Sequence, residues 1–271
     1  MPELPEVETT RRGIETTVTG RTIAALIVRD RRLRWPIAAG VEGEVAGQRI
    51  KAVGRRAKYL LIHCERGTLI LHLGMSGSLR VLESTTAVIK HDHFDLLLDS
   101  GLILRFNDPR RFGSLHWTRA DPAKHKLLKS VGPEPLEREF DGTYLFRASR
   151  QRKVALKNFL MNGHVVVGVG NIYASESLFR ARLRPGRRAA SLTKREAVRL
   201  VRAVKTVLGN AIRVGGTTLR DYVGADGNPG YFRQKLYVYE RAGDPCRVCR
   251  TKIRKVAHGQ RSTYYCPECQ K

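Results

Sequence analysis

The first residues of the chain carry a candidate nucleophile. The sequence opens Met1-Pro2-Glu3-Leu4-Pro5-Glu6, and removal of Met1 would expose the secondary amine of Pro2 beside the carboxylate of Glu3. An α-amino group titrates near pH ~7.7 to 8, so a neutral fraction is present that can attack an electrophilic carbon. A secondary amine condenses to an iminium, which stays cationic and favours later elimination steps. The alternative is ordinary Met-Pro processing before a short acidic helix that stops at Gly13.

Four of the five cysteines form a second cluster with chemical potential. Cys246 and Cys249 form one Cys-x2-Cys pair, Cys266 and Cys269 form another, and sixteen residues separate the pairs. This spacing is typical of a structural zinc site, in which four thiolates leave no open coordination position. A redox dithiol is the alternative, but it needs one pair on a βαβ scaffold and not two matched pairs. We therefore expect one structural Zn²⁺ held by these four residues, and Cys64 as a core residue.

The residues between the two cysteine pairs alternate in polarity as β-strands do. The pattern predicts a strand over 251–256, a turn over 257–261 and a return strand over 262–265. Arg261 would then lie at the tip of a zinc-stapled β-hairpin. An arginine at such a position most often contacts phosphate.

The charge balance indicates the kind of partner. The chain has 271 residues with 50 Lys and Arg against 25 Asp and Glu, a formal net charge of +25. That excess is more than solubility requires and favours a polyanionic partner. Membrane surfaces also attract basic proteins, but we find no apolar stretch of spanning length and no signal-peptide pattern. Nucleic acid in a reducing compartment, the cytoplasm or nucleoid, is therefore the favoured partner.

Short strands must position the N-terminal residues. Apolar runs punctuated by Gly, Asp and Asn predict strands over 22–28, 49–53, 59–64, 68–73, 77–82, 94–98 and 102–106. Such a series is typical of a β-sandwich or a β-barrel. The Pro-rich residues 132–136 then indicate a hinge or linker before the periodicity changes.

Helices are expected from about residue 141 to residue 214. A capping box at 193–196 begins the clearest of them, whose apolar stripe predicts a core face and which ends before Gly215. A second helix is expected over 172–179 with Asn171 as its N-cap, following two glycines. This pattern binds phosphate in some proteins and merely caps a helix in many others.

Four separated segments can now be considered together. They are Pro-Glu-Leu-Pro-Glu-Val-Glu at 2–8, His-Leu-Gly-Met-Ser-Gly at 72–77, Asp-Pro-Arg-Arg-Phe-Gly at 108–113 and Val-Gly-Val-Gly-Asn-Ile-Tyr at 167–173. With the zinc hairpin, they resemble the bacterial formamidopyrimidine-DNA glycosylase family over nearly the whole chain. The related endonuclease VIII branch, which favours oxidised pyrimidines, usually begins Pro-Glu-Gly-Pro-Glu. Leu4 therefore favours the branch that acts on oxidised purines.

The resemblance implies an α+β fold with three parts. They are an N-terminal β-sandwich with a leading helix, a helical domain with a helix, two-turns, helix module, and a C-terminal zinc β-hairpin. The domains expected are a catalytic domain at 1–131, a hinge at 132–150, a DNA-binding domain at 151–236 with a lesion loop at 217–231, and the zinc hairpin at 237–271. The glycine-rich lesion loop is a candidate lid.

The resemblance also implies an activity and its catalytic residues. The activity is base-excision repair by a bifunctional glycosylase and abasic-site lyase that removes 8-oxoguanine and formamidopyrimidines and cuts the strand by β,δ-elimination. Pro2 would attack C1′ of the damaged nucleotide, and Glu3 would act as acid and base at the sugar. Lys58 is associated with β-elimination near the lesion phosphate. Arg261 is associated with phosphate contact and δ-elimination, and charge stabilisation suits an arginine better than proton donation.

A further set of residues is implied to bind the DNA. DNA contacts are expected from His91, Arg110, Arg152 and Asn171, and Met75, Arg111 or Arg110, and Phe112 are expected to fill the gap left by an extruded base. His93 is easily confused with His91. Core packing is the alternative role for Met75 and Phe112. Asn162 departs from the acidic residue expected in many relatives.

The implied partner is double-stranded DNA that carries oxidised bases or abasic sites. We expect a monomer in the cytoplasm, associated with the nucleoid, with no membrane partner. A DNA-binding protein that recognises damage without cutting is the non-enzymatic alternative. The joint presence of Pro2, Glu3 and Lys58 favours the enzyme.

Overall fold

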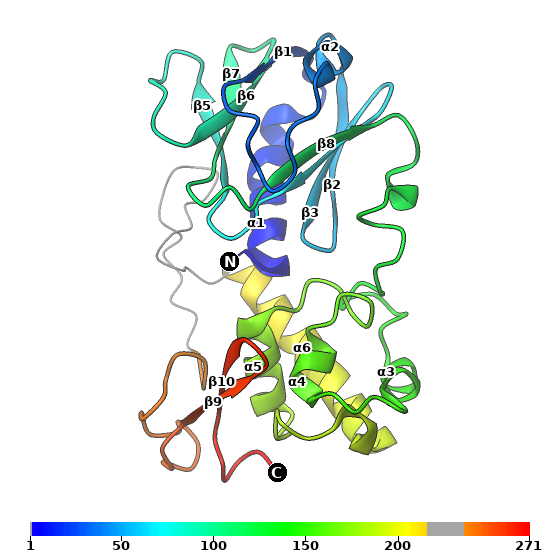
Figure 1. The fold of residues 1–271 in the computed structure, drawn as a ribbon, viewed down its shortest axis with the longest axis vertical. Helices are drawn as coiled ribbons and strands as arrows, with labels where there is room; N and C mark the ends of the chain where they lie inside the picture. Colours follow the sequence, from blue (N-terminus) through cyan, green and yellow to red (C-terminus); the bar gives the residue numbers. More distant parts are fainter. Residues whose placement is uncertain (1, 216–235) are drawn as a thin grey trace. The chain divides into compact units, whose positions relative to one another are not determined.

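A computed structural model describes residues 2–215 and 236–271 of the chain (Figure 1). The predicted lesion loop at 217–231 lies outside the described residues. The described residues form two compact units, one covering 2–129 and the other covering 130–214 and 236–271. The domain limits given above remain predictions.

Helix α1 (Leu4–Val18) opens the first unit. Glu3 is its N-cap and forms a capping box with Glu6, whose Oε2 accepts a 2.9 Å hydrogen bond from the Glu3 backbone N–H. The helix continues through Gly13, so the expectation of a glycine stop is wrong. A glycine inside a helix costs only about 1 kcal/mol relative to alanine. Burial of the apolar face that includes Ile14 offsets that cost.

Two antiparallel four-stranded sheets follow, with strand orders β1-β6-β7-β5 and β2-β3-β4-β8. Their bounds are β1 Ile23–Val28, β2 Ile50–Arg56, β3 Tyr59–Cys64, β4 Thr68–His72, β5 Ser78–Glu83, β6 Asp92–Leu98, β7 Leu102–Asn107 and β8 Ser114–Thr118. Helix α1 contacts strands of both sheets, as Figure 1 shows. Buried apolar side chains of α1 and both sheets share one core, in which Cys64 also lies. The first unit is therefore a β-sandwich with a leading helix.

All seven predicted strands of the sandwich are present, and three elements were missed. They are the short helix α2 (Val41–Val45), strand β8 and the 3-10 turn η1 (Pro122–Lys124). Strand β8 pairs antiparallel with β4, from Thr68 opposite Thr118 to His72 opposite Ser114. It directly follows the 108–113 segment, so this pairing fixes the downstream end of that segment.

The second unit is helical apart from its C-terminal hairpin. Its helices are α3 Gly142–Ser149, α4 Leu156–Leu160, α5 Asn171–Arg180 and α6 Lys194–Arg213, with a 3-10 turn η2 at Ala189–Ser191. The predicted capping box of α6 is confirmed, because Thr193 and Glu196 exchange hydrogen bonds. The apolar stripe of α6 is buried and faces α3 and α5. Helices α4 and α5 are joined by consecutive turns over 161–170.

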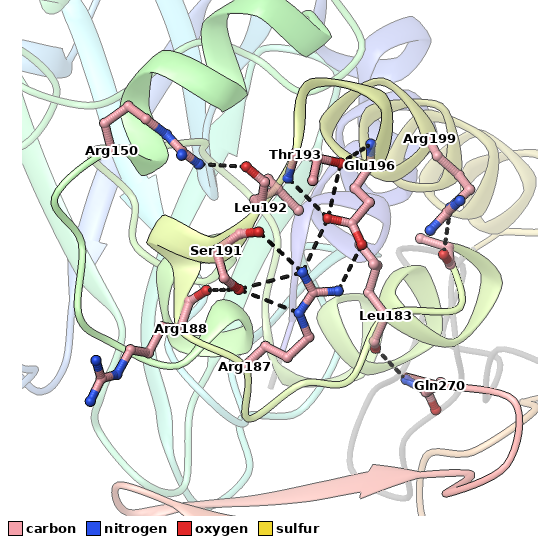
Figure 2. A network of polar contacts seen from close by, with 11 residues as sticks. Arg150, Leu183, Arg187, Arg188, Ser191, Leu192, Thr193, Glu196, Arg199 and Gln270 are labelled. Carbon is pink, nitrogen blue, oxygen red and sulfur yellow. Dashed lines mark hydrogen bonds and ion pairs between the residues drawn. The ribbon is translucent and has the colours of Figure 1, made fainter.

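A polar network fixes the loop between α5 and α6 (Figure 2). The Arg187 guanidinium donates to both carboxylate oxygens of Glu196, at 2.7 and 3.1 Å, and also to Ser191. Hydrogen bonds from Arg187, together with those from Thr193, lower the pKa of Glu196 to about 2. Arg150 adds a 2.5 Å hydrogen bond to the Leu192 carbonyl. The start of α6 is thus held by side chains from the loop before it.

The C-terminal hairpin consists of β9 (Arg254–His258) and β10 (Arg261–Tyr265). The predicted turn over 257–261 is too long, because both strands reach further toward the tip. Arg261 pairs with His258, which leaves Gly259 and Gln260 as a two-residue turn. Gly259 has a φ of 61°, as tight hairpin turns of this kind require. Arg261 is therefore the exposed first residue of the return strand.

Candidate active site

The start of α1 presents Pro2 and Glu3 together. Both residues are buried, and the helix begins directly after Glu3. The N-terminal end of a helix carries a positive partial charge, which disfavours a protonated amine next to it. The role of the Pro2 amine as a nucleophile after removal of Met1 stays a prediction.

Lys58 lies in the turn that joins β2 to β3. Arg56 pairs with Tyr59, so Ala57 and Lys58 form the turn, with Ala57 at a φ of 56°. His72 lies at the end of the neighbouring strand β4. Its burial, followed by the positive charges of Lys58 and Arg34, lowers the pKa of His72 to about 4. His72 is therefore neutral at physiological pH, and the Lys58 charge acts on this part of the unit.

Glu8 connects α1 to the β2–β3 hairpin. Its Oε2 accepts a 3.2 Å hydrogen bond from Arg55, whose Nη1 donates to the Ala57 carbonyl. Burial raises the pKa of Glu8. Hydrogen bonds from Arg11 and Arg12 and the charges of Arg11 and Arg55 lower it by more than burial raises it, so the pKa of Glu8 is below its ordinary value. Helix α1 and the turn that carries Lys58 are thus joined by one network of ion pairs and hydrogen bonds.

The segment 108–113 is anchored by the buried carboxylate of Asp108. Its Oδ1 accepts from the Ser76 hydroxyl at 2.7 Å, and its Oδ2 accepts from the Gly113 N–H at 2.7 Å. The backbones of 73–77 and 108–113 touch directly, because a Cβ on Gly74 would come within 2.4 Å of Gly113 N. The two segments that carry Met75 and Phe112 therefore form one structure.

The side chains of the 73–77 and 108–113 segments differ in exposure and in their contacts. Phe112 is 42% exposed, and the Arg110 guanidinium lies 5.1 Å above its ring. Arg111 instead pairs with Asp30 at 3.3 Å. Met75 is half-buried. Core packing, the alternative role for Phe112, is therefore wrong, and Arg110 is the arginine that accompanies Phe112 at the surface.

The structure separates the two histidines that the sequence left easily confused. His93 is 1% exposed, and both of its ring nitrogens lie within hydrogen-bond distance of backbone carbonyls. His91 is half-buried, with a φ of 74°, and its carbonyl accepts from Asp108 N. The ring of His93 is thus occupied by the protein's own backbone. DNA contact by His91 stays a prediction.

In the second unit, Lys157, which was not predicted, holds the side chain of Asn171, which was. Lys157 on α4 is fully buried, and its Nζ donates to Asn171 Oδ1 at 2.5 Å. It also donates to the Ser262 carbonyl at 2.8 Å and to Thr263 Oγ1 at 2.9 Å. With its oxygen engaged, Asn171 keeps its NH₂ donors for another acceptor. Lys157 thereby connects Asn171 to the strand that begins at Arg261.

Asn171, Arg152 and Asn162 lie at or near the ends of helices α4 and α5. Gly170, not Asn171, is the N-cap of α5, so Asn171 lies in the first turn of that helix. Arg152 is exposed in the segment before α4, whose backbone is held because the Arg152 carbonyl accepts from Ala190 N at 3.0 Å. Asn162 is exposed, and its Oδ1 accepts from the His164 N–H.

Glu176 anchors the chain where it enters the zinc module. Its carboxylate accepts backbone hydrogen bonds from Tyr237, Val238 and Tyr239, each at 2.9 Å. Burial raises the pKa of this carboxyl, and the three N–H donors oppose that shift. No sequence signal pointed to Glu176, because its partners lie more than sixty residues away.

The four cysteines of the zinc module converge on one point. Their Sγ atoms all lie within 4.8 Å of one another. Contacts join different motifs, Cys246 with Cys269 at 3.9 Å and Cys249 with Cys266 at 3.4 Å. Tetrahedral thiolates with Zn–S bonds of about 2.3 Å lie about 3.8 Å apart. The set therefore fits one structural Zn²⁺ and does not fit two separate redox dithiols.

Among the described residues, we find no helix with the length and apolar character needed to cross a membrane.

Comparison with known proteins finds domains of one family along most of the chain. Residues 1–115 match the formamidopyrimidine-DNA glycosylase N-terminal domain, 131–223 match its H2TH domain, and 243–271 match the zinc finger found in FPG and IleRS. Proteins named formamidopyrimidine-DNA glycosylase from Thioalkalivibrio sulfidiphilus and Nitrosococcus oceani are 57% and 55% identical, with complete coverage of both chains.

Solved structures give the same result. The MutM (Fpg) protein of Thermus thermophilus has a TM-score of 0.89 at 40% identity and covers 99% of this chain and 98% of its own. Lactococcus lactis Fpg, in complex with DNA that contains an abasic site, has a TM-score of 0.91 at 30% identity, with 99% of both chains covered. The chain therefore belongs to the formamidopyrimidine-DNA glycosylase family.

Proposed function

We propose that this protein is a base-excision repair enzyme that combines DNA glycosylase and abasic-site lyase activities. It removes oxidised purines, chiefly 8-oxoguanine opposite cytosine and formamidopyrimidines, from duplex DNA. It acts on genomic DNA in the cytoplasm, in association with the nucleoid. One observation carries the proposal, which is the Pro2-Glu3 pair at the start of α1 in a chain that matches its relatives over its full length.

The first chemical stage is base release by Pro2. The Pro2 nitrogen forms a bond to C1′ as the bond from C1′ to the base breaks, and the base leaves with that electron pair and takes up a proton. The Pro2 nitrogen loses its N–H proton, and its lone pair then forms the iminium as the C1′–O4′ bond opens and O4′ takes up a proton. Glu3 serves as the acid in ring opening and as the base in the later hydrolysis of the adduct.

Strand cleavage follows from the iminium. Loss of a proton from C2′ lets the 3′ phosphate leave in β-elimination, and loss of a second sugar proton lets the 5′ phosphate leave in δ-elimination. Lys58 lies near the lesion phosphate and supports the first step. Arg261 stays protonated and stabilises the phosphate that leaves in the second step. The position of Arg261 as the exposed first residue of β10 supports this role.

Duplex binding requires that the extruded nucleotide be replaced in the stack. Phe112 and Arg110, exposed together on the 108–113 segment, form the wedge, and Met75 on the adjoining 73–77 segment fills the gap. His91, Arg152 and Asn171 bind the DNA backbone. For Asn171, the engagement of its Oδ1 by Lys157 leaves an amide NH₂, the donor that a phosphate oxygen accepts.

Analysis of the cleavage products tests this proposal. A 5′-labelled duplex with 8-oxoguanine opposite cytosine should yield a fragment that ends in a 3′ phosphate, the product of both eliminations. Arg261→Gln should accumulate the β-elimination product, whereas Arg254→Gln, on the neighbouring strand β9, should not. Faster cleavage of a thymine glycol duplex would place the enzyme on the pyrimidine side. Tight binding with no cleavage would show a damage-binding protein instead.

A further inference from the structure

His93 lies beneath the segment that carries the proposed wedge. Its ring is buried on β6, with Nε2 3.0 Å from the Asp108 carbonyl oxygen and Nδ1 3.2 Å from the Asp30 carbonyl oxygen. A carbonyl oxygen can only accept, so the ring is the donor in either bond. A neutral ring donates to one of the two carbonyls at a time, and an imidazolium donates to both.

Both carbonyls belong to residues that hold residues 108–113, called here the wedge segment, in place. Asp108 begins the segment, and its carboxylate binds Ser76 and Gly113. The Asp30 carboxylate pairs with Arg111. His93 therefore contacts this segment at its first residue, Asp108, and also contacts Asp30, the ion-pair partner of Arg111.

The wedge segment needs such support because regular secondary structure does not hold it. Residues 108–113 lie between β7 and β8, and Arg111 has a left-handed φ of 58°, which is unfavourable for a residue with a side chain. Hydrogen bonds accepted by the Asp108 carboxylate, the Arg111–Asp30 ion pair and the hydrogen bonds of the His93 ring maintain that conformation. Phe112 and Arg110 are exposed on the same segment.

We propose that His93 is a positioning residue for base extrusion. It holds Arg110 and Phe112, the proposed wedge, in the position from which they enter the gap in the duplex. This inference rests on the proposed function. His93 touches neither substrate nor reacting atoms, so it acts only through the wedge. Its effect should accordingly appear only where a base stack must be opened.

An effect confined to duplex substrates would distinguish a positioning role of His93 from a role in core packing. His93 also lies beside Phe106, with ring centroids 6.3 Å apart, so a role limited to the core would weaken every activity of the enzyme equally. A wedge is needed for a lesion in a duplex. It is not needed for an abasic site in a single strand, where no base has to be extruded from between paired strands.

The test compares His93→Phe on these two substrates under single-turnover conditions. Excision of 8-oxoguanine from a duplex should slow about tenfold, while cleavage at an abasic site in a single strand stays within about twofold of wild type. His63→Phe is the matched control, because His63 is a half-buried histidine of the other sheet, and it should change neither rate. Equal losses on both substrates for His93→Phe would overturn the proposal.

Two further variants keep the test decisive if His93→Phe folds poorly. Glutamine places an amide donor near the position of Nε2, and asparagine places one near Nδ1. His93→Gln should therefore keep the Asp108 bond and retain duplex excision within about threefold, with a larger loss for His93→Asn. Equal duplex excision by these two variants would contradict control of the wedge through Asp108.

A double variant shows whether His93 acts through Phe112. If it does, His93→Phe combined with Phe112→Ala should excise no more slowly than Phe112→Ala alone. Multiplied losses would show an independent role and overturn the proposal. Absence of single-strand cleavage by the wild-type enzyme would instead contradict the proposed lyase function, so the two failures are distinguishable.

Discussion

At the scale of single residues, the buried charge of Lys157 makes the strongest demand on its surroundings. Moving an ammonium group out of water costs several kcal/mol unless oxygens replace its hydration. Asn171 Oδ1, the Ser262 carbonyl and Thr263 Oγ1 supply those oxygens. The requirement to satisfy this charge fixes Asn171 and the start of β10 at the same time.

Replacement of this lysine should therefore be costly. Lys157→Met is expected to lower the free energy of unfolding by about 3 kcal/mol, because three buried oxygens lose their donor. Lys153→Met, at an exposed lysine just before α4, should change it by no more than about 0.5 kcal/mol. Urea unfolding at pH 7 followed by circular dichroism measures both. Equal effects would contradict the importance of the buried contacts.

Glu196 gives a prediction with a defined pH range. Its pKa is about 2 in the folded protein and about 4.3 in the unfolded chain, so the unfolded state binds more protons between these values. Its stabilising contribution is thus complete above about pH 4.3 and is lost as the pH falls from there to about 2. The difference in unfolding free energy between wild type and Glu196→Gln should shrink over that range.

Urea unfolding at a series of pH values measures this difference. The exposed Glu139 provides the control, since Glu139→Gln should leave the pH profile of wild type unchanged. A wild-type minus Glu196→Gln difference that stays constant from pH 6 to pH 2 would show that the Arg187 contact does not depend on the carboxylate charge.

The sequence identified residues whose type and spacing are unusual by themselves. Pro2 beside Glu3 and the four cysteines could be selected in this way, and the cysteines meet as predicted. Lys157, Glu176 and His93 could not be selected. Lysine, glutamate and histidine are common residue types. The roles of these three residues depend on contacts with residues more than sixty positions away in the chain.

At the scale of elements, predictions succeeded where the local pattern was strong. The capping box and apolar stripe of α6 were predicted from the sequence, as were the seven alternating strands. Strand β8 was missed because its strand character comes from pairing with β4. The hairpin turn was predicted too long because cross-strand pairing, which local sequence does not reveal, extends β9 and β10 to a tip of two residues.

Loss of the metal should affect the zinc hairpin and leave the first unit unchanged. Chelation of the metal, or Cys249→Ser, should unfold the hairpin that carries Arg261 and weaken binding to an abasic-site duplex about tenfold or more. Both tryptophans, Trp35 and Trp117, lie in the first unit, so their emission should stay unchanged. Restored zinc should restore binding. Unchanged binding after complete metal removal would contradict a structural role for the ion.

For the whole molecule, the net charge of +25 favours DNA binding that weakens as the salt concentration rises. Each phosphate neutralised contributes a slope of about −0.9 to log K against log salt concentration. Arg152→Gln should therefore make the slope shallower by about 0.9, because a phosphate contact is lost. Arg202→Gln, an exposed residue on α6, removes the same charge and should leave the slope unchanged. Fluorescence anisotropy at several salt concentrations measures both, and equal slopes for the two variants would contradict the contact.

Borohydride trapping of the Met-processed enzyme on a duplex with 8-oxoguanine opposite cytosine would detect the proposed Pro2 iminium itself. Reduction of the iminium should leave a covalent protein–DNA adduct, and peptide mapping should place it on Pro2. Pro2→Gly should bind the duplex without forming that adduct. An adduct that persists on another residue in Pro2→Gly, or no adduct in a wild-type enzyme that binds tightly, would contradict catalysis by the N-terminal proline.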